Sequence, residues 1–365
     1  MSPRRTNLND ALPECHKVYT FAATVMVTQN REMQKRLLYI INPVAGTERK
    51  DPVRTAIKEN TDNEQYAWKI AETRYSGHGA VLATMAVEND VDVVVAIGGD
   101  GTVNEIARSL TQSRTTLGII PCGSGNGLAR HLQIPLDPKK AVGLINRGTV
   151  AAVDYGIINR HPFFCTCGVG FDATISYMFS SSIRRGVASY LEKVLKEITR
   201  YRPETYIISS GNNEIACRAF LLTCANASQY GNNAYIAPSA SMSDGLMDVT
   251  VIEPFTAFEA PQLAYKLLDG TLTPGGRIRM FRSDRLHILR EREGVIHCDG
   301  DPVRAGKEID VHIVPKGLRI IVNEAARNKR FSLLNTIEEA FNSFIERSGL
   351  AIQDSTDNRQ SGAKG

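Results

Sequence analysis

Near-continuous apolar runs alternate with helical patterns in the first part of the chain. The runs cover residues 36–41, 66–73, 91–97 and 116–120, and segments of helical periodicity separate them. Strands that are buried on both faces consist of such runs, and strands that alternate with helices form parallel sheets. The pattern predicts a doubly wound α/β domain over residues 34–155.

The pattern changes after residue 150. Shorter runs with period-two alternation lie at residues 219–226, 246–253, 285–290 and 308–314, between segments rich in Gly, Asn, Asp and Pro. This alternation is typical of antiparallel strands. We therefore expect a second domain over residues 156–317, an antiparallel β-sandwich, with a cleft between the two domains.

Three further segments have amphipathic helical patterns, at residues 184–202, 255–270 and 331–350. The first has one apolar face and many basic residues elsewhere, which is typical of a packed helix with a solvated side. A contact with a membrane surface is the alternative. Residues 351–365 are polar, and we expect a disordered tail there.

Residues 1–33 precede the first predicted strand, and we expect an extension outside the fold. A mildly apolar stretch there follows basic residues, as in a signal peptide. Asp10 and Glu14 interrupt the basic region, however, and no convincing cleavage site follows.

Composition limits the classes of function. The 365 residues are 42% hydrophobic, enough for two cores, and the net charge of +4 is too small to indicate a nucleic-acid partner. The seven cysteines form no CxxC pair, which favours reduced thiols in a cytoplasm. Cys165 and Cys167 lie in an apolar run and are expected to be buried.

Three predicted strands end in glycine-rich loops. The loops are NPVAGT at residues 42–47, GGDGT at 98–102 and PCGSGNG at 121–127. Each precedes a helix at the same sheet edge, where backbone N–H groups attract phosphate. One such loop alone could be only a tight turn, but three together indicate a phosphate site. None of them matches a dinucleotide fingerprint or a Walker loop.

The same loops, followed by SDGLMDV at residues 243–249 and CDGDP at 298–302, form an ordered set. This set resembles the soluble diacylglycerol kinase and sphingosine kinase family of lipid kinases, over most of residues 34–325. The resemblance implies transfer of the ATP γ-phosphate to a lipid hydroxyl in a cleft between an α/β domain and a β-sandwich. It also implies that residues 318–350 return to the first domain.

The resemblance implies that the glycine loops and one threonine contact ATP. The implied residues are Asn42, Pro43, Val44, Ala45, Gly46, Thr73, Gly98, Gly99, Asp100, Gly101, Thr102, Val103, Asn104, Glu105, Gly123, Ser124 and Asn126. Helix capping or turn formation explains each Asn or Thr equally well when it is taken alone. The family's lysine after the first loop is replaced by Thr47, and Arg49 or Lys50 could substitute for it.

Two aspartates in CDGDP are the main candidates for proton acceptance. The family pattern is Asp-Gly-Glu, so Asp301 carries a side chain one methylene shorter than the usual glutamate. We divide the role of the base between Asp299 and Asp301. Arg130 and Asp154 match charged residues of the family's active-site network, with a surface ion pair as the alternative.

The family also has a structural Mg²⁺ site, which the resemblance assigns to Asp244 with the main-chain carbonyls of Ser241 and Leu246. Hard oxygen ligands suit Mg²⁺, and a plain Asp-Gly turn is the alternative.

Asp100 is a separate question, because a bare carboxylate would repel phosphates. It must meet Mg²⁺, a backbone donor, a basic partner or the acceptor hydroxyl, and we expect Asp100→Asn to reduce turnover far more than stability.

The expected function is that of an ATP- and Mg²⁺-dependent lipid kinase acting on a lipid such as diacylglycerol at a membrane surface. The expected location is the cytoplasm, peripherally on the inner face of the membrane. The sequence does not decide whether the protein is a monomer or a homodimer. A sphingoid-base kinase, a soluble-substrate kinase of the NAD kinase type and a non-catalytic binding module are the alternatives. The sequence does not select the lipid.

Overall fold

The computed structural model describes residues 34–45, 51–180, 197–198, 200–256 and 258–324. Its first part is a parallel sheet in the order β2-β1-β3-β4. The strands are β1 (Lys35–Ile41), β2 (Tyr66–Glu72), β3 (Val93–Gly98) and β4 (Thr116–Pro121). Each corresponds to one of the four predicted apolar runs.

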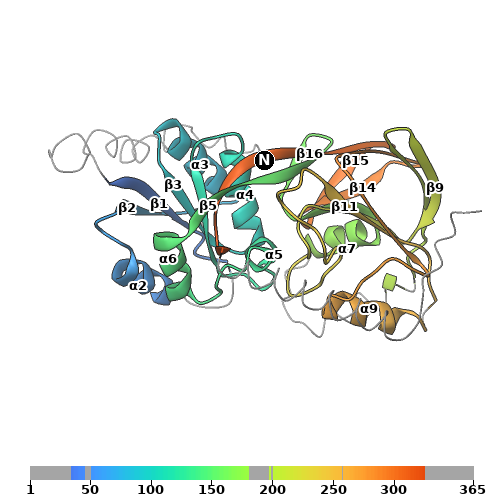
Figure 1. Ribbon diagram of the computed structural model, residues 1–365, viewed down its shortest axis with the longest axis horizontal. Helices are drawn as coiled ribbons and strands as arrows, with labels where there is room; N and C mark the ends of the chain where they lie inside the picture. Colours follow the sequence, from blue (N-terminus) through green and yellow to red (C-terminus); the bar gives the residue numbers. More distant parts are fainter. Residues whose placement is uncertain (1–33, 46–50, 181–196, 199, 257, 325–365) are drawn as a thin grey trace, which may run out of the picture. The chain divides into compact units, whose positions relative to one another are not determined.

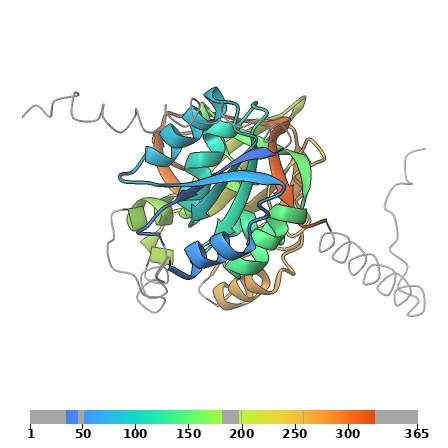
Figure 2. The same cartoon turned by 90° about the vertical axis from the view of Figure 1, so that its left-hand side faces the viewer.

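Helices cover both faces of this sheet (Figure 2). The helices are α2 (Asp51–Asn60), α3 (His78–Glu88), α4 (Asp100–Leu110), the short α5 (Gly127–His131) and α6 (Pro138–Arg147). Alternate residues of β3 face two different apolar clusters: Val94 packs with Ile106 of α4, and Val95 packs with Ile145 of α6. Burial on both faces explains why the strands are continuous apolar runs.

The second part is a sandwich of antiparallel strands. Its elements are β6 (His161–Phe163), β7 (Thr166–Gly170), α7 (Phe171–Ser180), β8 (Glu204–Ser210), β9 (Asn213–Ala219), β10 (Leu221–Ala225), β11 (Met247–Ile252), α9 (Ala260–Asp269), β12 (Ile278–Ser283), β13 (Arg285–Arg290), β14 (Gly294–Cys298) and β15 (Asp301–Ala305). One sheet has the order β12-β11-β10-β7-β14-β15. It packs through a shared apolar cluster on strands β8, β9 and β13 of the other sheet. The predicted combination of an α/β domain and a β-sandwich is therefore confirmed.

Two long strands run through both parts (Figure 1). β5 (Thr149–Ile158) and β16 (Glu308–Val322) pair antiparallel, with a register shift between Val314 and Leu318. Beyond this shift, Ile320 pairs parallel with Leu117 of β4. The predicted boundary at residues 155/156 thus falls inside β5, because an irregularity within a continuous strand pair, rather than a linker, separates the two parts.

The predicted strand at residues 308–314 is too short for the same reason. Leu318 and Ile320 continue β16 into the apolar core of the α/β part, so residues 318–322 do return there. The predicted helix at 331–350, the tail, the extension at 1–33 and most of the predicted helix at 184–202 lie outside the described residues.

Helix α9 begins later than the predicted 255–270. Glu259 accepts hydrogen bonds from the Thr256 N–H and hydroxyl, at 2.7 and 2.9 Å, and this turn precedes the helix. Pro261 then lies in the first turn, where its missing N–H is not needed.

The six cysteines of the described ranges are free thiols, and Cys165 and Cys167 are buried as expected. No helix in the described part of the chain is both long and apolar enough to cross a bilayer.

The returning strand gives the first testable prediction. Leu318 is fully buried, so Leu318→Ala should lower the free energy of unfolding by about 2–5 kcal/mol in urea denaturation. Leu289→Ala, at a position that is 36% exposed on β13, is the control and should have a clearly smaller effect. Equal losses would show that β16 does not anchor the core.

Candidate active site

The second and third glycine loops are packed against each other. The Cys122 N–H donates to the Gly98 carbonyl at 2.7 Å. A Cβ on Gly123 would lie 2.6 Å from the Gly99 Cα, closer than carbon atoms can approach. Glycine is therefore needed here so that the two backbones can touch.

Asp100 joins these two loops. Its Oδ2 accepts the Asn126 N–H at 2.8 Å, and its Oδ1 accepts the Gly127 N–H at 2.7 Å. Both oxygens are thus occupied by backbone donors of the third loop. Of the four partners considered for this carboxylate, the structure shows the backbone donor.

The third loop is also braced from within. Asn126 has a left-handed backbone (φ 51°) and is 7% exposed. Its side chain accepts the Gly123 N–H at 2.9 Å and donates to the Gly123 carbonyl at 2.6 Å. Arg130 on α5 donates from Nε to the Gly125 carbonyl at 3.0 Å. The Asn126 side chain therefore shapes the loop, whereas Ser124 is exposed.

The N-terminus of α4 has the properties of an anion site. Its first helical bond runs from the Val103 N–H to the Gly99 carbonyl, so the N–H groups of residues 100–102 have no partner within the helix. Gly101 is exposed, and a Cβ there would meet nothing within 4 Å. Open space beside N–H donors and a positive helix end fits the phosphates of a nucleotide.

The first loop supports this helix start. Asn42 donates from Nδ2 to the Thr102 hydroxyl at 2.9 Å and accepts the Val44 N–H at 3.1 Å. Pro43 and Val44 are exposed, Ala45 and Thr73 are partly exposed, and Gly46 lies outside the described residues with Thr47, Arg49 and Lys50.

Other predicted nucleotide residues serve the packing of α4. Thr102 and Asn104 are 7% and 3% exposed, Val103 is buried, and a Cβ on Gly98 would lie 2.6 Å from the Thr102 side chain. Glu105 accepts the Ala80 N–H at the start of α3, at 3.1 Å. The surfaces left for a ligand are the N–H groups of residues 100–102, Ser124 and the exposed end of the first loop.

Asp299 of the sandwich is held by the backbone. Its carboxylate accepts N–H groups from Phe164 at 2.8 Å, Cys165 at 2.7 Å and Thr166 at 3.0 Å. Burial raises the pKa of Asp299 to about 6, and these three donors oppose the rise. Both oxygens are occupied, so this carboxylate is poorly placed to receive a proton from a hydroxyl.

Asp301 is more accessible. Its side chain is 56% exposed, and its Oδ2 lies 3.5 Å from Nη2 of Arg108 on α4. Partial burial raises the pKa of Asp301, and the Arg108 guanidinium lowers it. A substrate hydroxyl can reach a half-exposed carboxylate, and the raised pKa suits a general base.

Arg108 is a functional candidate that the motifs did not identify. It lies three residues after Glu105, so the two charged side chains share a face of α4. That spacing is the only signal in the sequence. Within the described residues the Arg108 Nε is buried without a hydrogen-bond partner, so the guanidinium is not fully used by its contact with Asp301.

Asp154 also links two loops through hydrogen bonds. It is 1% exposed, and its oxygens accept the Lys316 N–H at 2.7 Å and the Gly245 N–H at 2.8 Å. These bonds join the irregular segment of β16 to the turn at residues 241–246. The carboxylate has the environment of an anchor rather than of a group that contacts substrate.

The predicted Mg²⁺ ligands Ser241, Asp244 and Leu246 do lie in one turn. Asp244 Oδ1 accepts the Leu246 N–H at 3.1 Å, as in a plain Asp-Gly turn, and Oδ2 lies 3.9 Å from Arg282. No group of three or more His, Cys, Asp or Glu residues suited to a metal occurs in the described part of the chain. One carboxylate and two carbonyls suit Mg²⁺, but Arg282 competes for the carboxylate, and the site stays a prediction.

The fold and these loops agree with comparisons to known families. A family model described as diacylglycerol kinase catalytic domain matches residues 36–158. One described as YegS C-terminal NAD kinase beta sandwich-like domain matches residues 165–322. The chain therefore carries a domain of the first kind followed by a domain of the second kind.

Its relatives carry kinase names. The diacylglycerol kinase of Bacillus subtilis (strain 168) is 25% identical over 73% of this chain and 90% of its own length. A probable lipid kinase YegS-like of Enterobacter sp. (strain 638) is 27% identical over 77% of this chain and 94% of its own. A crystal structure of a diacylglycerol kinase from Bacillus anthracis str. Sterne superposes with a TM-score of 0.63 at 21% identity, over 80% of this chain and 98% of that one.

The position of Asp100 changes the prediction made for its replacement. Asp100→Asn offers one acceptor and a new donor to two backbone N–H groups, so it should lower the free energy of unfolding by about 1–3 kcal/mol as well as turnover. Asp137→Asn is the control, because Asp137 caps α6 by accepting one N–H and Asn caps equally well. Urea unfolding of both variants tests this. If Asp100→Asn left the stability unchanged, the two hydrogen bonds to the third loop would not stabilise the fold.

Proposed function

We propose that this protein is an ATP-dependent kinase that transfers the γ-phosphate of ATP to the hydroxyl of a membrane lipid. The observation that carries the proposal is the position of α4. Its N-terminus offers free N–H groups to phosphate, and Arg108 of the same helix contacts Asp301 of the sandwich. One rigid helix therefore relates a phosphate site to a candidate base.

The spacing along α4 supports this arrangement. Arg108 is the eighth residue after Asp100 on α4, about 12 Å further along the helix axis. Helical side chains lean toward the N-terminus, which brings the guanidinium and Asp301 closer to the phosphate end. That separation suits a nucleotide whose terminal phosphate points toward the base.

The reaction follows from these positions. Asp301 accepts the proton of the lipid hydroxyl, and the hydroxyl oxygen forms a bond to the γ-phosphorus while the bond to the β,γ-bridging oxygen breaks, which releases ADP. The N–H groups of residues 100–102 bind phosphate oxygens, and Arg130 adds positive charge beside the third loop. Bound Mg²⁺ would neutralise further phosphate charge.

The substrate class rests on the family. Relatives named diacylglycerol kinase and YegS-like lipid kinase favour a lipid alcohol such as diacylglycerol; a sphingoid base is the second candidate. On this proposal the protein works peripherally at the cytoplasmic face of a membrane. No contact in the described residues favours a soluble acceptor such as NAD or a purely binding role.

The test is incubation of the full chain with labelled ATP, Mg²⁺ and a total lipid extract, followed by mass spectrometry of the labelled products. We expect a phosphorylated lipid alcohol, and its mass identifies the substrate. ATP binding without any labelled lipid would reject the proposed function, and NADP formed from added NAD would favour the soluble-substrate alternative.

The roles of the two sandwich aspartates can be separated. Asp301→Asn should lower turnover by about a hundred- to ten-thousandfold with little change in stability, because its side chain is half exposed. Asp299→Asn should lower the free energy of unfolding by about 1–3 kcal/mol, because three N–H donors lose a carboxylate. Turnover assays and urea unfolding distinguish the two; full activity of Asp301→Asn would remove it as the base.

Arg108 should set the pH dependence of this base. The rate should rise with pH as Asp301 loses its proton. Because Arg108 lowers the pKa of Asp301, Arg108→Ala should raise that pKa and move the acidic limb of kcat/KM to higher pH. Arg108→Lys keeps the charge and should shift the limb less. An unchanged limb in Arg108→Ala would show that the contact at 3.5 Å does not act on the base.

A further inference from the structure

Helix α9 of the sandwich exposes large apolar side chains. Phe258, just before the helix, is 96% exposed, and Tyr265 and Leu268 are 66% and 61% exposed. Tyr265 and Leu268 are three residues apart and lie on one side of the helix, and Phe258 lies in the turn that precedes it. No residue of α9 is buried, so this helix lies on the surface of the sandwich with an apolar outer side.

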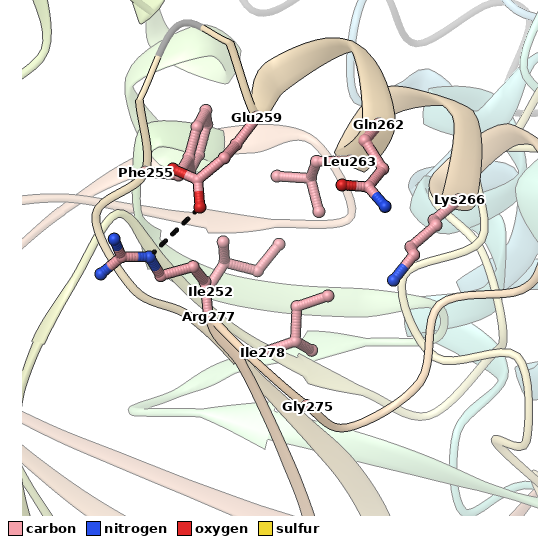
Figure 3. Close-up of a pocket in the computed structure, with 10 residues that line it drawn as sticks. Ile252, Phe255, Glu259, Gln262, Leu263, Lys266, Gly275, Arg277 and Ile278 are labelled. Atoms are coloured by element: carbon pink, nitrogen blue, oxygen red, sulfur yellow. Dashed lines mark hydrogen bonds and ion pairs between the residues drawn. The ribbon is translucent and has the colours of Figure 1, made fainter.

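A hollow of about 200 Å³ lies under the same helix. Figure 3 shows Leu263, Gln262 and Lys266 extending from α9 toward Ile252 and Ile278 on the strands. The two isoleucines are 0% and 7% exposed and belong to the apolar cluster beneath. The floor of the hollow is therefore apolar.

The rim of the hollow carries one uncompensated positive charge. Arg277 lies 3.4 Å from Glu259, so these two charges offset each other. The Lys266 ammonium forms no ion pair with an acidic side chain in the described part of the chain, and Gln262 adds an amide donor beside it. An apolar floor with a cationic rim matches an amphiphile that has an anionic head.

The size of this surface argues against a protein partner. Ten residues of helix are about 15 Å long and about 10 Å wide, so the outer side presents roughly 150 Å², whereas each partner of a standard protein interface buries roughly 800 Å². Aromatic and aliphatic side chains beside a lysine are instead typical of helices that lie in the plane of a membrane interface.

α9 is also joined to the glycine loops. The Tyr235 N–H donates to the Leu267 carbonyl at 2.7 Å, and the Asn232 N–H donates to the Gly125 carbonyl at 2.9 Å. A short segment, residues 232–235, thus connects the helix to the loop that Asp100 clamps. A membrane bound to α9 would be held at a fixed relation to that loop.

We propose that Phe258, Tyr265 and Leu268 insert into a bilayer of anionic phospholipid, with Lys266 and Gln262 binding a phosphate headgroup at the hollow under α9. This site supplements the proposed active site: it holds the protein on the surface where its substrate lies. The inference rests on the proposed function only for that purpose, because binding to vesicles needs no catalysis.

The test is cosedimentation of the full chain with phosphatidylcholine vesicles with and without phosphatidylglycerol. We expect tighter binding to the anionic vesicles. Lys266→Gln should weaken that binding about fivefold, and Tyr265→Ser with Leu268→Ser should weaken it about tenfold or more on both vesicles. Matched controls are Lys139→Gln and Leu136→Ser, which alter an exposed lysine and an exposed leucine of the α/β part and should leave binding unchanged.

Three results would overturn the inference: α9 variants that bind as the wild type does, controls that lose binding equally, or α9 variants that change the oligomeric state in sedimentation velocity without affecting vesicle binding. Circular dichroism confirms that each variant is folded. Assays in detergent micelles keep the two proposals apart. If the wild type phosphorylates no lipid in micelles, the proposed function fails, while vesicle binding still tests α9. If the α9 variants keep their activity in micelles but lose it on vesicles, the proposed function and the membrane site are both supported.

Discussion

The rest of the site depends on the bonds from the Asp100 carboxylate to the Asn126 and Gly127 N–H groups. Hydrogen bonds to an ionised group stabilise by roughly 1.5–3 kcal/mol each, and these two fix one glycine loop against the next. They also occupy the negative charge that would otherwise face a phosphate. The helix start, the third loop and Arg130 on α5 all take their positions from this clamp.

The same physical device recurs in the other aspartates that the motifs selected. Asp154 and Asp299, like Asp100, accept backbone N–H groups with both oxygens. Their donors lie 91 to 162 residues away along the chain. A sequence shows that an aspartate belongs to a motif, but not which of its oxygens is already bonded, so carboxylates that brace loops could not be separated from accessible ones before the contacts were known. Asp301 differs because its side chain is half exposed.

The strands that the sequence predicted correctly depend on local patterns of apolar residues. Buried parallel strands need apolar residues on both faces, and this requirement is visible in six consecutive residues of β3. The predicted domain boundary falls inside a strand because β5 and β16 continue through it, with only a register shift between Val314 and Leu318. Arg108 was missed because its partner Asp301 is 193 residues away, and a lone arginine on a helix resembles a solvated surface residue.

Several contacts cross from the α/β part to the sandwich, and two of them restrict how the proposed site can open. Arg108 contacts Asp301, and the Gly125 carbonyl accepts the Asn232 N–H. The first is a partly exposed ion pair, which contributes little to stability and can separate at low cost. The second lies between closely packed backbones, because a Cβ on Gly231 would lie 3.1 Å from the Gly125 Cα. Any movement that admits a lipid headgroup to Asp301 should therefore break the Arg108 contact first and rotate about the Gly125 contact. Such a rotation keeps α9 at a fixed position relative to the third glycine loop.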